Sequence, residues 1–178
     1  MPARAADLAE IDTFCDALWL EDGLARATLD SYRSDLGRLA LWLADNAGEP
    51  LLDLRETALT AFIAHLSRQT RASSQARYLS TLRRFYRWQL ARGRIVADPT
   101  LKLANPTRPS RLPKVMSEKQ VDSLLAAPDI DSPLGLRDRA MLETLYATGL
   151  RVSELVNLKI HEVSFNDNVL RALGKGSK

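Results

Sequence analysis

The residue best placed for chemistry is Arg151, which follows Gly149 and precedes a second run of helical sequence. Apolar residues recur at helical spacing through 136–146, and a glycine can adopt the left-handed conformation that ends such a helix. Arg151 therefore stands where a new helix begins, and the free backbone N–H groups there favour an anion. Its guanidinium suits a phosphate or a carboxylate, and Glu154 can hold it in place. A structural Arg–Glu pair that joins two helices is the alternative interpretation.

A second candidate is the helix predicted over 73–92, which Ser73 or Ser74 can cap. Apolar side chains share one side of it, namely Tyr78, Leu79, Leu82, Phe85, Tyr86 and Leu90. The adjacent side carries Arg77, Arg83, Arg84 and Arg87. No acidic residue occurs between Arg68 and Arg94, so these cations repel one another unless an anion binds them. The pattern predicts contact with a polyanion; a basic surface without a ligand is the alternative.

The distribution of charge supports the same hypothesis. The net charge of the whole chain is +3, but residues 1–67 carry −7, residues 68–114 carry +11 and residues 115–178 carry −1. Positive charge concentrated beside an acidic segment is typical of a protein that binds a polyanion at one face.

Helical periodicity places these residues in a mainly α chain. Four helices are expected over 7–20, 25–47, 55–69 and 73–92, with short connections, and they predict a compact helical domain over 1–106. Residues 107–116 are a proline-punctuated basic linker in which Arg108, Arg111 and Lys114 can follow a phosphate backbone. A second unit, 117–178, opens on a capping box from Ser117 to Gln120 and later shows short strands around 166–168.

Several classes of protein are disfavoured. Cys15 is the single cysteine and lies on an apolar helical stripe, so we expect it in the core and not in a disulfide. Neither His65 nor His161 has companions at metal-ligand spacing, so no metal site is expected. No apolar run is long enough to span a bilayer and the N-terminus lacks a signal pattern, so we expect a cytoplasmic protein.

The sequence also resembles a known family. Residues 147–155, Ala-Thr-Gly-Leu-Arg-Val-Ser-Glu-Leu, resemble the first catalytic motif of the tyrosine recombinases, the phage integrase family. Residues 112–114 and 133–140 resemble its bacterial Xer subgroup. The resemblance covers the whole chain. It implies a four-helix, SAM-like core-binding domain followed by the first helices and a short β segment of a catalytic domain.

The resemblance also implies a chemistry. In this family a tyrosine attacks the DNA phosphodiester, a 3′-phosphotyrosyl bond forms and the 5′-hydroxyl leaves, without a metal or any other cofactor. By the match, Arg151 clamps the anionic transition state with Glu154 in support, and Lys175 is the lysine of the β-hairpin. The second and fourth helices would face the major groove. The predicted DNA-binding residues are Arg33, Arg71, Arg77, Ser80, Thr81, Arg83, Arg84, Arg87, Arg108, Arg111 and Lys114.

The family's remaining catalytic residues are not found in the sequence. Its His-x-x-Arg pair has no counterpart, because Ser164 stands three residues after His161. The four tyrosines, Tyr32, Tyr78, Tyr86 and Tyr146, lie on predicted helices and are expected to pack, so none is assigned as the nucleophile. We therefore expect a recombinase that stops inside its catalytic domain and is inactive alone.

The resemblance further implies partners: duplex DNA of the chromosome dimer-resolution type, a second Xer-type recombinase, and a DNA translocase of the division septum. Two alternatives stay open. The chain could be a non-catalytic DNA-binding module that occupies such sites, or a helical interaction protein with no role on DNA.

Overall fold

The computed structural model describes residues 2–106 and 115–172, and its chain divides into two units, Met1–Ser110 and Arg111–Lys178. The first contains α1 (Ala5–Asp22), α2 (Arg26–Asn46), the short 3-10 helix η1 (Leu51–Asp53), α3 (Glu56–Gln69) and α4 (Ala72–Ala91). The second contains α5 (Glu118–Ala126), α6 (Pro133–Thr148), α7 (Val152–Val156), the 3-10 helix η2 (Ile160–Glu162) and the strands β1 (Val163–Ser164) and β2 (Val169–Leu170). The predicted mainly α fold, with four helices first and a short β segment later, is confirmed.

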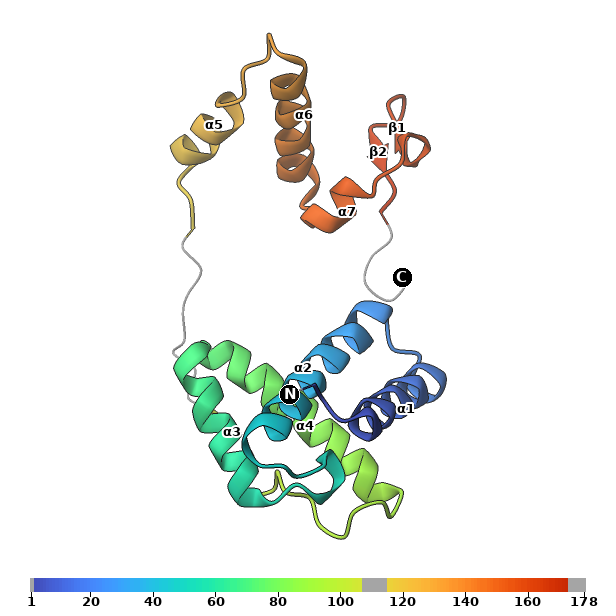
Figure 1. Ribbon diagram of the computed structural model, residues 1–178. Helices are drawn as coiled ribbons and strands as arrows, with labels where there is room; N and C mark the ends of the chain where they lie inside the picture. The colour runs from blue at the N-terminus through green and yellow to red at the C-terminus, as the bar shows by residue number, and fades with distance from the viewer. Residues whose placement is uncertain (1, 107–114, 173–178) are drawn as a thin grey trace. The chain divides into compact units, whose positions relative to one another are not determined.

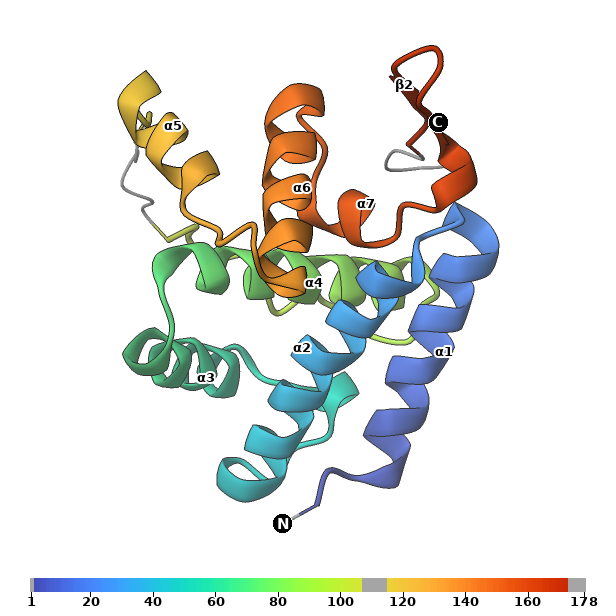
Figure 2. The ribbon, with the colours of Figure 1, turned by 90° about the horizontal axis from the view of Figure 1, so that it is seen from above.

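In the first unit, α1 packs along α2, and α4 packs against both α2 and α3 (Figures 1 and 2). Phe14 of α1 lies at the centre, edge-to-face with Phe85 at a centroid distance of 5.3 Å and with Trp88 at 5.4 Å. Cys15 beside it is fully buried, as predicted. These aromatic contacts fix α4 against α1, so the polar side of α4 has a defined direction.

Two buried side chains hold η1 between α1 and α4. The Asp7 carboxylate accepts a hydrogen bond from the Leu51 backbone N–H at 2.8 Å, and the Tyr86 hydroxyl donates to the Leu51 carbonyl at 3.0 Å. Both polar groups of one backbone residue are thereby satisfied inside the core, as buried polar groups require. Burial also raises the pKa of Tyr86, so its hydroxyl stays protonated and able to donate.

Two details of α4 differ from the prediction. The helix begins at Ala72 with Arg71 as its N-cap, so Ser73 and Ser74 lie inside the first turn. No side chain caps the helix, because an arginine side chain has hydrogen-bond donors but no acceptor. Leu90 is 41% exposed and does not belong to the buried side, whereas Gln89 is fully buried. The real packing surface of α4 is therefore rotated relative to the apolar stripe read from the sequence.

The second unit follows its local signals closely. Ser117 caps α5 as predicted, with its backbone N–H donating to the Gln120 side chain at 2.9 Å. Ser132 caps α6, which begins three residues before the predicted start at 136. β1 and β2 pair antiparallel, with Val163 opposite Leu170.

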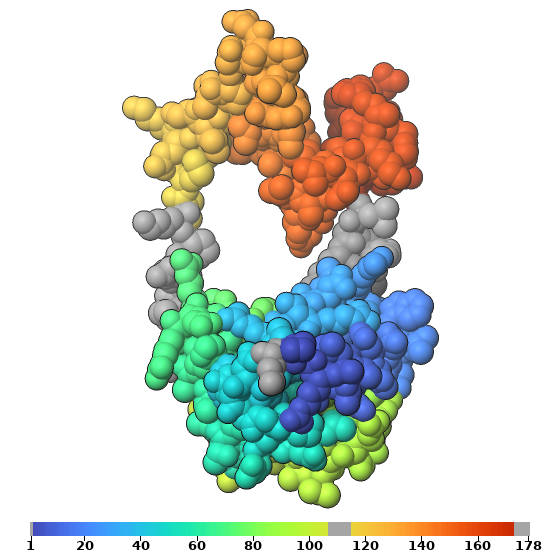
Figure 3. Space-filling model, in the orientation of Figure 1, coloured from blue at the N-terminus to red at the C-terminus, as the bar shows by residue number. Residues whose placement is uncertain are grey.

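Apolar side chains of the second unit are largely uncovered within the part of the chain that the structure describes. Leu136 is 58% exposed, and Tyr146, which we expected to pack, is 67% exposed on α6. Figure 3 shows the side chains of the first unit closing over one another. In the second unit α5 contacts α6, and α6 contacts α7, but these contacts leave much apolar surface exposed. The prediction for Tyr146 was wrong because nothing in the described part of the unit covers that side of α6.

Candidate nucleic-acid interface

The arginine face of α4, defined here as Arg77, Arg83, Arg84 and Arg87, is present, but most of its members have partners. Arg84 pairs with Asp22 at 2.6 Å and Arg77 with Asp35 at 2.5 Å. The expectation of an unpaired cationic face was therefore wrong. The acidic side chains that α4 lacks are supplied by α1 and α2, which pack beside it.

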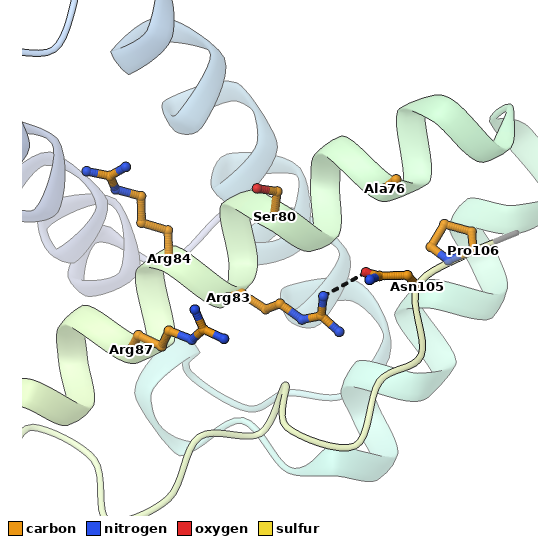
Figure 4. A pocket seen from close by; sticks show the side chains of 7 residues that line it. All are labelled: Ala76, Ser80, Arg83, Arg84, Arg87, Asn105 and Pro106. Carbon is orange, nitrogen blue, oxygen red and sulfur yellow. Dashed lines mark hydrogen bonds between the residues drawn. The ribbon is translucent and has the colours of Figure 1, made fainter. Parts of the chain in front are cut away.

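An open hollow of about 810 Å³ lies along this face. It is lined by Ala76, Ser80, Arg83, Arg84, Arg87, Asn105 and Pro106. Figure 4 shows Arg83 and Arg87 extending from the same side of α4, with Arg84 directed away. The described residues that line the hollow include no carboxylate. Such an arginine-lined, acid-free hollow is suited to an anion such as a phosphodiester.

Within the hollow, Arg83 and Arg87 are held differently. The Arg83 guanidinium donates to the Asn105 side chain at 2.7 Å and to the Leu103 carbonyl at 2.5 Å. Arg83 therefore holds residues 103–105, which follow α4 in the sequence, against the helix. Arg87 is exposed and forms no hydrogen bond or ion pair with any residue that the structure describes. Its charge is the least neutralised of the arginine face.

A buried carboxylate lies under the other end of this face. Asp35 of α2 is fully buried and accepts from Arg77 and, at 2.9 Å, from the Thr81 hydroxyl. Thr81 is only 1% exposed and its hydroxyl donates to Asp35, so little of this side chain is open to a ligand, and its contact with DNA stays a prediction. The guanidinium of Arg77 also lies over the Tyr78 ring, 4.8 Å from its centroid. Arg77 is thus anchored at one end and open at the other.

On α2, Arg33 is neutralised most strongly. Its guanidinium lies within 3.0 Å of Asp12, 3.3 Å of Asp16 and 3.8 Å of Asp30. The hydrogen bond to Asp12 raises the pKa of Arg33 further above its usual value. A phosphate would have to displace these carboxylates, and exposed pairs of this kind contribute little stability each.

Sequence reasoning missed polar residues at the start of α2. Thr28 and Ser31 border a second hollow of about 290 Å³, together with Ala27, Tyr32, Arg77 and Thr81. Their spacing of three places them on one side of the helix, away from buried Leu29 and Leu36. A signal was therefore present in the sequence, in small hydroxyl residues on the polar side of a predicted helix.

Arg151 has the local geometry that was predicted. Gly149 ends α6 with φ +67°, and α7 begins immediately after Arg151. Glu154 accepts from the backbone N–H and from the guanidinium of Arg151, each at 2.8 Å. Both hydrogen bonds lower the pKa of Glu154, and the one from the backbone N–H has the larger effect. Glu154 therefore orients Arg151, whose side chain is 71% exposed and open to a ligand.

The remaining candidates fall into two groups. Arg71 and Ser80 are exposed at the start and in the middle of α4. Four residues lie outside the described part of the chain, namely Arg108, Arg111, Lys114 and Lys175. In the described part, no group of three or more potential ligands could hold a metal ion, and no helix is long and apolar enough to cross a membrane.

Comparison with known proteins identifies the class. Residues 11–93 match the N-terminal SAM-like domain of phage integrases, and residues 114–178 match the phage integrase family. The fold is similar to that of part of lambda integrase. The solved dimer bound to a COC′ core site has a TM-score of 0.72 at 21% identity, covering 95% of this chain and 45% of that one. The tetramer bound to a Holliday junction has a TM-score of 0.74 at 21% identity, covering 95% and 47%.

Curated relatives are much closer in sequence. Tyrosine recombinase XerD of Ralstonia nicotianae is 48% identical over 100% of this chain and 58% of its own length. XerD of Xanthomonas axonopodis pv. citri is 51% identical over 98% and 57%, and XerD of Pseudomonas aeruginosa is 50% identical over 94% and 56%. The chain belongs to the phage integrase, or tyrosine recombinase, family. It spans a little over half the length of these relatives.

Proposed function

We propose that this chain is a DNA-binding part of a XerD-like site-specific recombinase. The observation that carries the proposal is the acid-free arginine hollow of α4, in a chain about half identical to proteins named XerD. The finer role that we propose is the resolution of chromosome dimers, in the cytoplasm, during chromosome partition at cell division. A XerC-like recombinase on the neighbouring half-site and a DNA translocase of the division septum are the proposed partners, and duplex DNA is the ligand.

The first unit would bind the duplex with α2 and α4. Phosphates would contact Arg87 directly and would compete for Arg84 and Arg33 with the carboxylates that now hold them. Because the pair of Arg84 with Asp22 is about half exposed, exchanging the carboxylate for a phosphate costs little. Residues 107–116, with Arg108, Arg111 and Lys114, would continue the phosphate contacts as a linker between a domain over 1–106 and one over 117–178.

The second unit would contribute to strand cleavage. In the proposed step a tyrosine oxygen attacks the phosphorus, the bond from phosphorus to the 5′ oxygen breaks, and that oxygen leaves as a hydroxyl after gaining a proton. Arg151, oriented by Glu154, would neutralise the phosphoryl oxygens in the transition state. Lys175 would donate the proton. The nucleophile is not assigned in this chain, so we expect no cleavage by it alone.

The test is a gel-shift titration with a duplex that holds a dimer-resolution half-site and with a scrambled duplex, at two salt concentrations. About six phosphate contacts would give a log–log salt slope of about −5. Replacing Arg83, Arg84 and Arg87 by alanine should weaken binding to both duplexes. A control that replaces the exposed Arg55, Arg68 and Arg137 removes the same charge elsewhere and should weaken it much less. Equal effects of the two triple variants would exclude the arginine hollow as the interface.

The alternative is a non-catalytic module that occupies recombination sites. A nicked half-site incubated with the chain and run on a denaturing gel separates the two functions, because only an enzyme forms a covalent adduct. Tyr146 is the exposed tyrosine nearest the Arg151 motif, so Tyr146→Phe is the matched control. An adduct that disappears in this variant would contradict the assignment of no nucleophile.

A further inference from the structure

Two exposed arginines of α4, Arg77 and Arg87, differ in how their charge is balanced. The side chain of Arg77 is 51% exposed, but its ion-pair partner Asp35 is only 1% exposed at its side chain. Arg87 is exposed and has no such partner in the described part of the chain. The charge of Arg77 is therefore neutralised by a buried carboxylate, whereas no carboxylate of the described residues neutralises Arg87.

The partner of Arg77 restricts its direction as well as its charge. One terminal nitrogen donates to Asp35, and the guanidinium carbon lies over the Tyr78 ring, 4.8 Å from its centroid. Arg38 donates to the Tyr78 hydroxyl at 3.1 Å and so holds that ring in turn. Because the fork is held in place before a ligand arrives, little side-chain entropy is lost when its free N–H groups bind.

The hollow beside Arg77 differs chemically from the arginine hollow. It is about 290 Å³ and is bordered by Arg77, Ala27, Tyr32 and the exposed residue Ser31. The Ser31 hydroxyl donates to the Ala27 carbonyl at 2.8 Å, so it can accept a hydrogen bond from a ligand. Base edges in the major groove present hydrogen-bond acceptors and donors beside the thymine methyl group. Hydroxyls, methyl-sized apolar surface and one oriented arginine match a base edge better than a phosphate.

We propose that Arg77 reads a base edge, with guanine as the preferred base, and that Asp35 is the positioning residue that makes this possible. Arg87 contacts phosphate and carries no sequence information. This division rests on the proposed DNA-binding function and deepens it, because it separates the residue that specifies from the residue that only positions.

The division has a measurable consequence. A phosphate contact by a cation without a carboxylate partner releases a counterion from the DNA. Loss of Arg87 therefore reduces the log–log salt slope of binding by about 0.9 and lowers the affinity for all DNA sequences alike. A bidentate arginine on guanine discriminates roughly 5- to 150-fold between bases. Because Arg77 is already neutralised by Asp35, its main effect is on sequence preference.

The experiment selects binders from a duplex library with randomised positions, using the full chain and each variant. Arg77→Lys keeps the positive charge over Asp35 but loses the planar fork, and is preferred to alanine, which would leave a buried carboxylate unpaired. We expect wild type to enrich a guanine at one position, Arg77→Lys to flatten that position with an unchanged salt slope, and Arg87→Ala to keep the profile while weakening every sequence.

Asp35→Asn provides a second, independent readout. It is close in shape to the carboxylate and frees the full charge of Arg77. We expect general affinity to rise and the salt slope to steepen, while preference at the same position is lost. A variant that was merely misfolded would lose affinity instead.

The outcomes distinguish this inference from the proposed function. If Arg77→Lys selects the same base preferences as wild type, the proposed role of Arg77 is wrong. The role is also wrong if wild type binds DNA without any base preference. In both cases the proposed DNA-binding function would remain supported. Absence of salt-sensitive binding to any duplex overturns the proposed function and this inference together.

Discussion

The two units of the chain bury apolar surface to very different extents. In the first, side chains such as Phe14, Leu36 and Tyr86 are fully enclosed by four helices. In the described part of the second, no apolar side chain reaches that degree of burial, and Leu136 and Val152 are 58% and 65% exposed. The first unit is therefore stabilised by a core of its own. The second keeps its shape through helix caps, the Gly149 turn and a short hairpin.

This difference separates the two proposed activities. A surface that must fit the grooves of a duplex needs side chains fixed by a packed scaffold, which the first unit provides for α4. Arg151 is oriented by one neighbour, Glu154, through hydrogen bonds within a single turn. We therefore expect DNA binding to depend on the core of the first unit, and the second unit to need packing against further apolar surface before Arg151 is rigidly placed.

The largest expected effect comes from matched leucine truncations. Leu36→Ala removes a fully buried side chain and should lower the free energy of unfolding by about 2–5 kcal/mol. Leu136→Ala removes an exposed one and should change it by less than about 0.5 kcal/mol. All three tryptophans, Trp19, Trp42 and Trp88, lie in the first unit, so tryptophan fluorescence follows the urea unfolding of Leu36→Ala. Leu136 lies in the second unit, so Leu136→Ala is followed by far-UV circular dichroism, which reports on the helices of both units. A large effect of Leu136→Ala on this signal would break the comparison.

A smaller effect is expected from pH, through Cys15 in the closed core. Burial raises the pKa of its thiol from 9.0 to about 11. Because the folded pKa lies above the unfolded value, the contribution to stability is complete below pH 9 and is lost as the pH rises toward 11. Between pH 9 and pH 10 the free energy of unfolding should fall by about 1 kcal/mol more in wild type than in Cys15→Ala. Equal slopes for the two proteins would mean that the thiol ionises without opening the core.

The smallest effect is expected from the cap of α5, and it should stay local. Ser117→Ala removes the N-cap hydroxyl and should destabilise the helix by roughly 1 kcal/mol. Carbon chemical shifts of residues 118–126 should move toward coil values, while the tryptophan unfolding midpoint stays unchanged. A shift of that midpoint would show that the second unit supports the first.

Much of the fold could be predicted because its signals are local. Glycine at 149 ends α6, and the capping box at Ser117 begins α5, each through contacts within a few residues. Helical periodicity likewise placed α1 to α4 to within a few residues at each end. The predicted serine cap of α4 was wrong because the helix begins at Ala72, one residue earlier than predicted, which places Ser73 and Ser74 inside its first turn.

The environment of the site was less predictable, because it depends on which helices meet. Asp22 and Asp35 are distant from α4 in sequence, and only packing brings them to Arg84 and Arg77. Thr81 was predicted to bind DNA from the family resemblance, but its hydroxyl is buried and donates to the Asp35 carboxylate. Sequence separation, not weak patterning, hid the partners of the arginine face.

The pair formed by Asp35 and Arg77 spans two helices, and this has a consequence for protein engineering. If position 77 alone is varied, the Asp35 carboxylate loses its cationic partner in nearly every variant of the library. This carboxylate is fully buried, so leaving it unpaired is strongly destabilising. Most such variants would be lost to misfolding before their target preference could be selected. On the proposed role of Arg77 in reading a base, changing the DNA sequence that this chain prefers requires positions 35 and 77 to be randomised together.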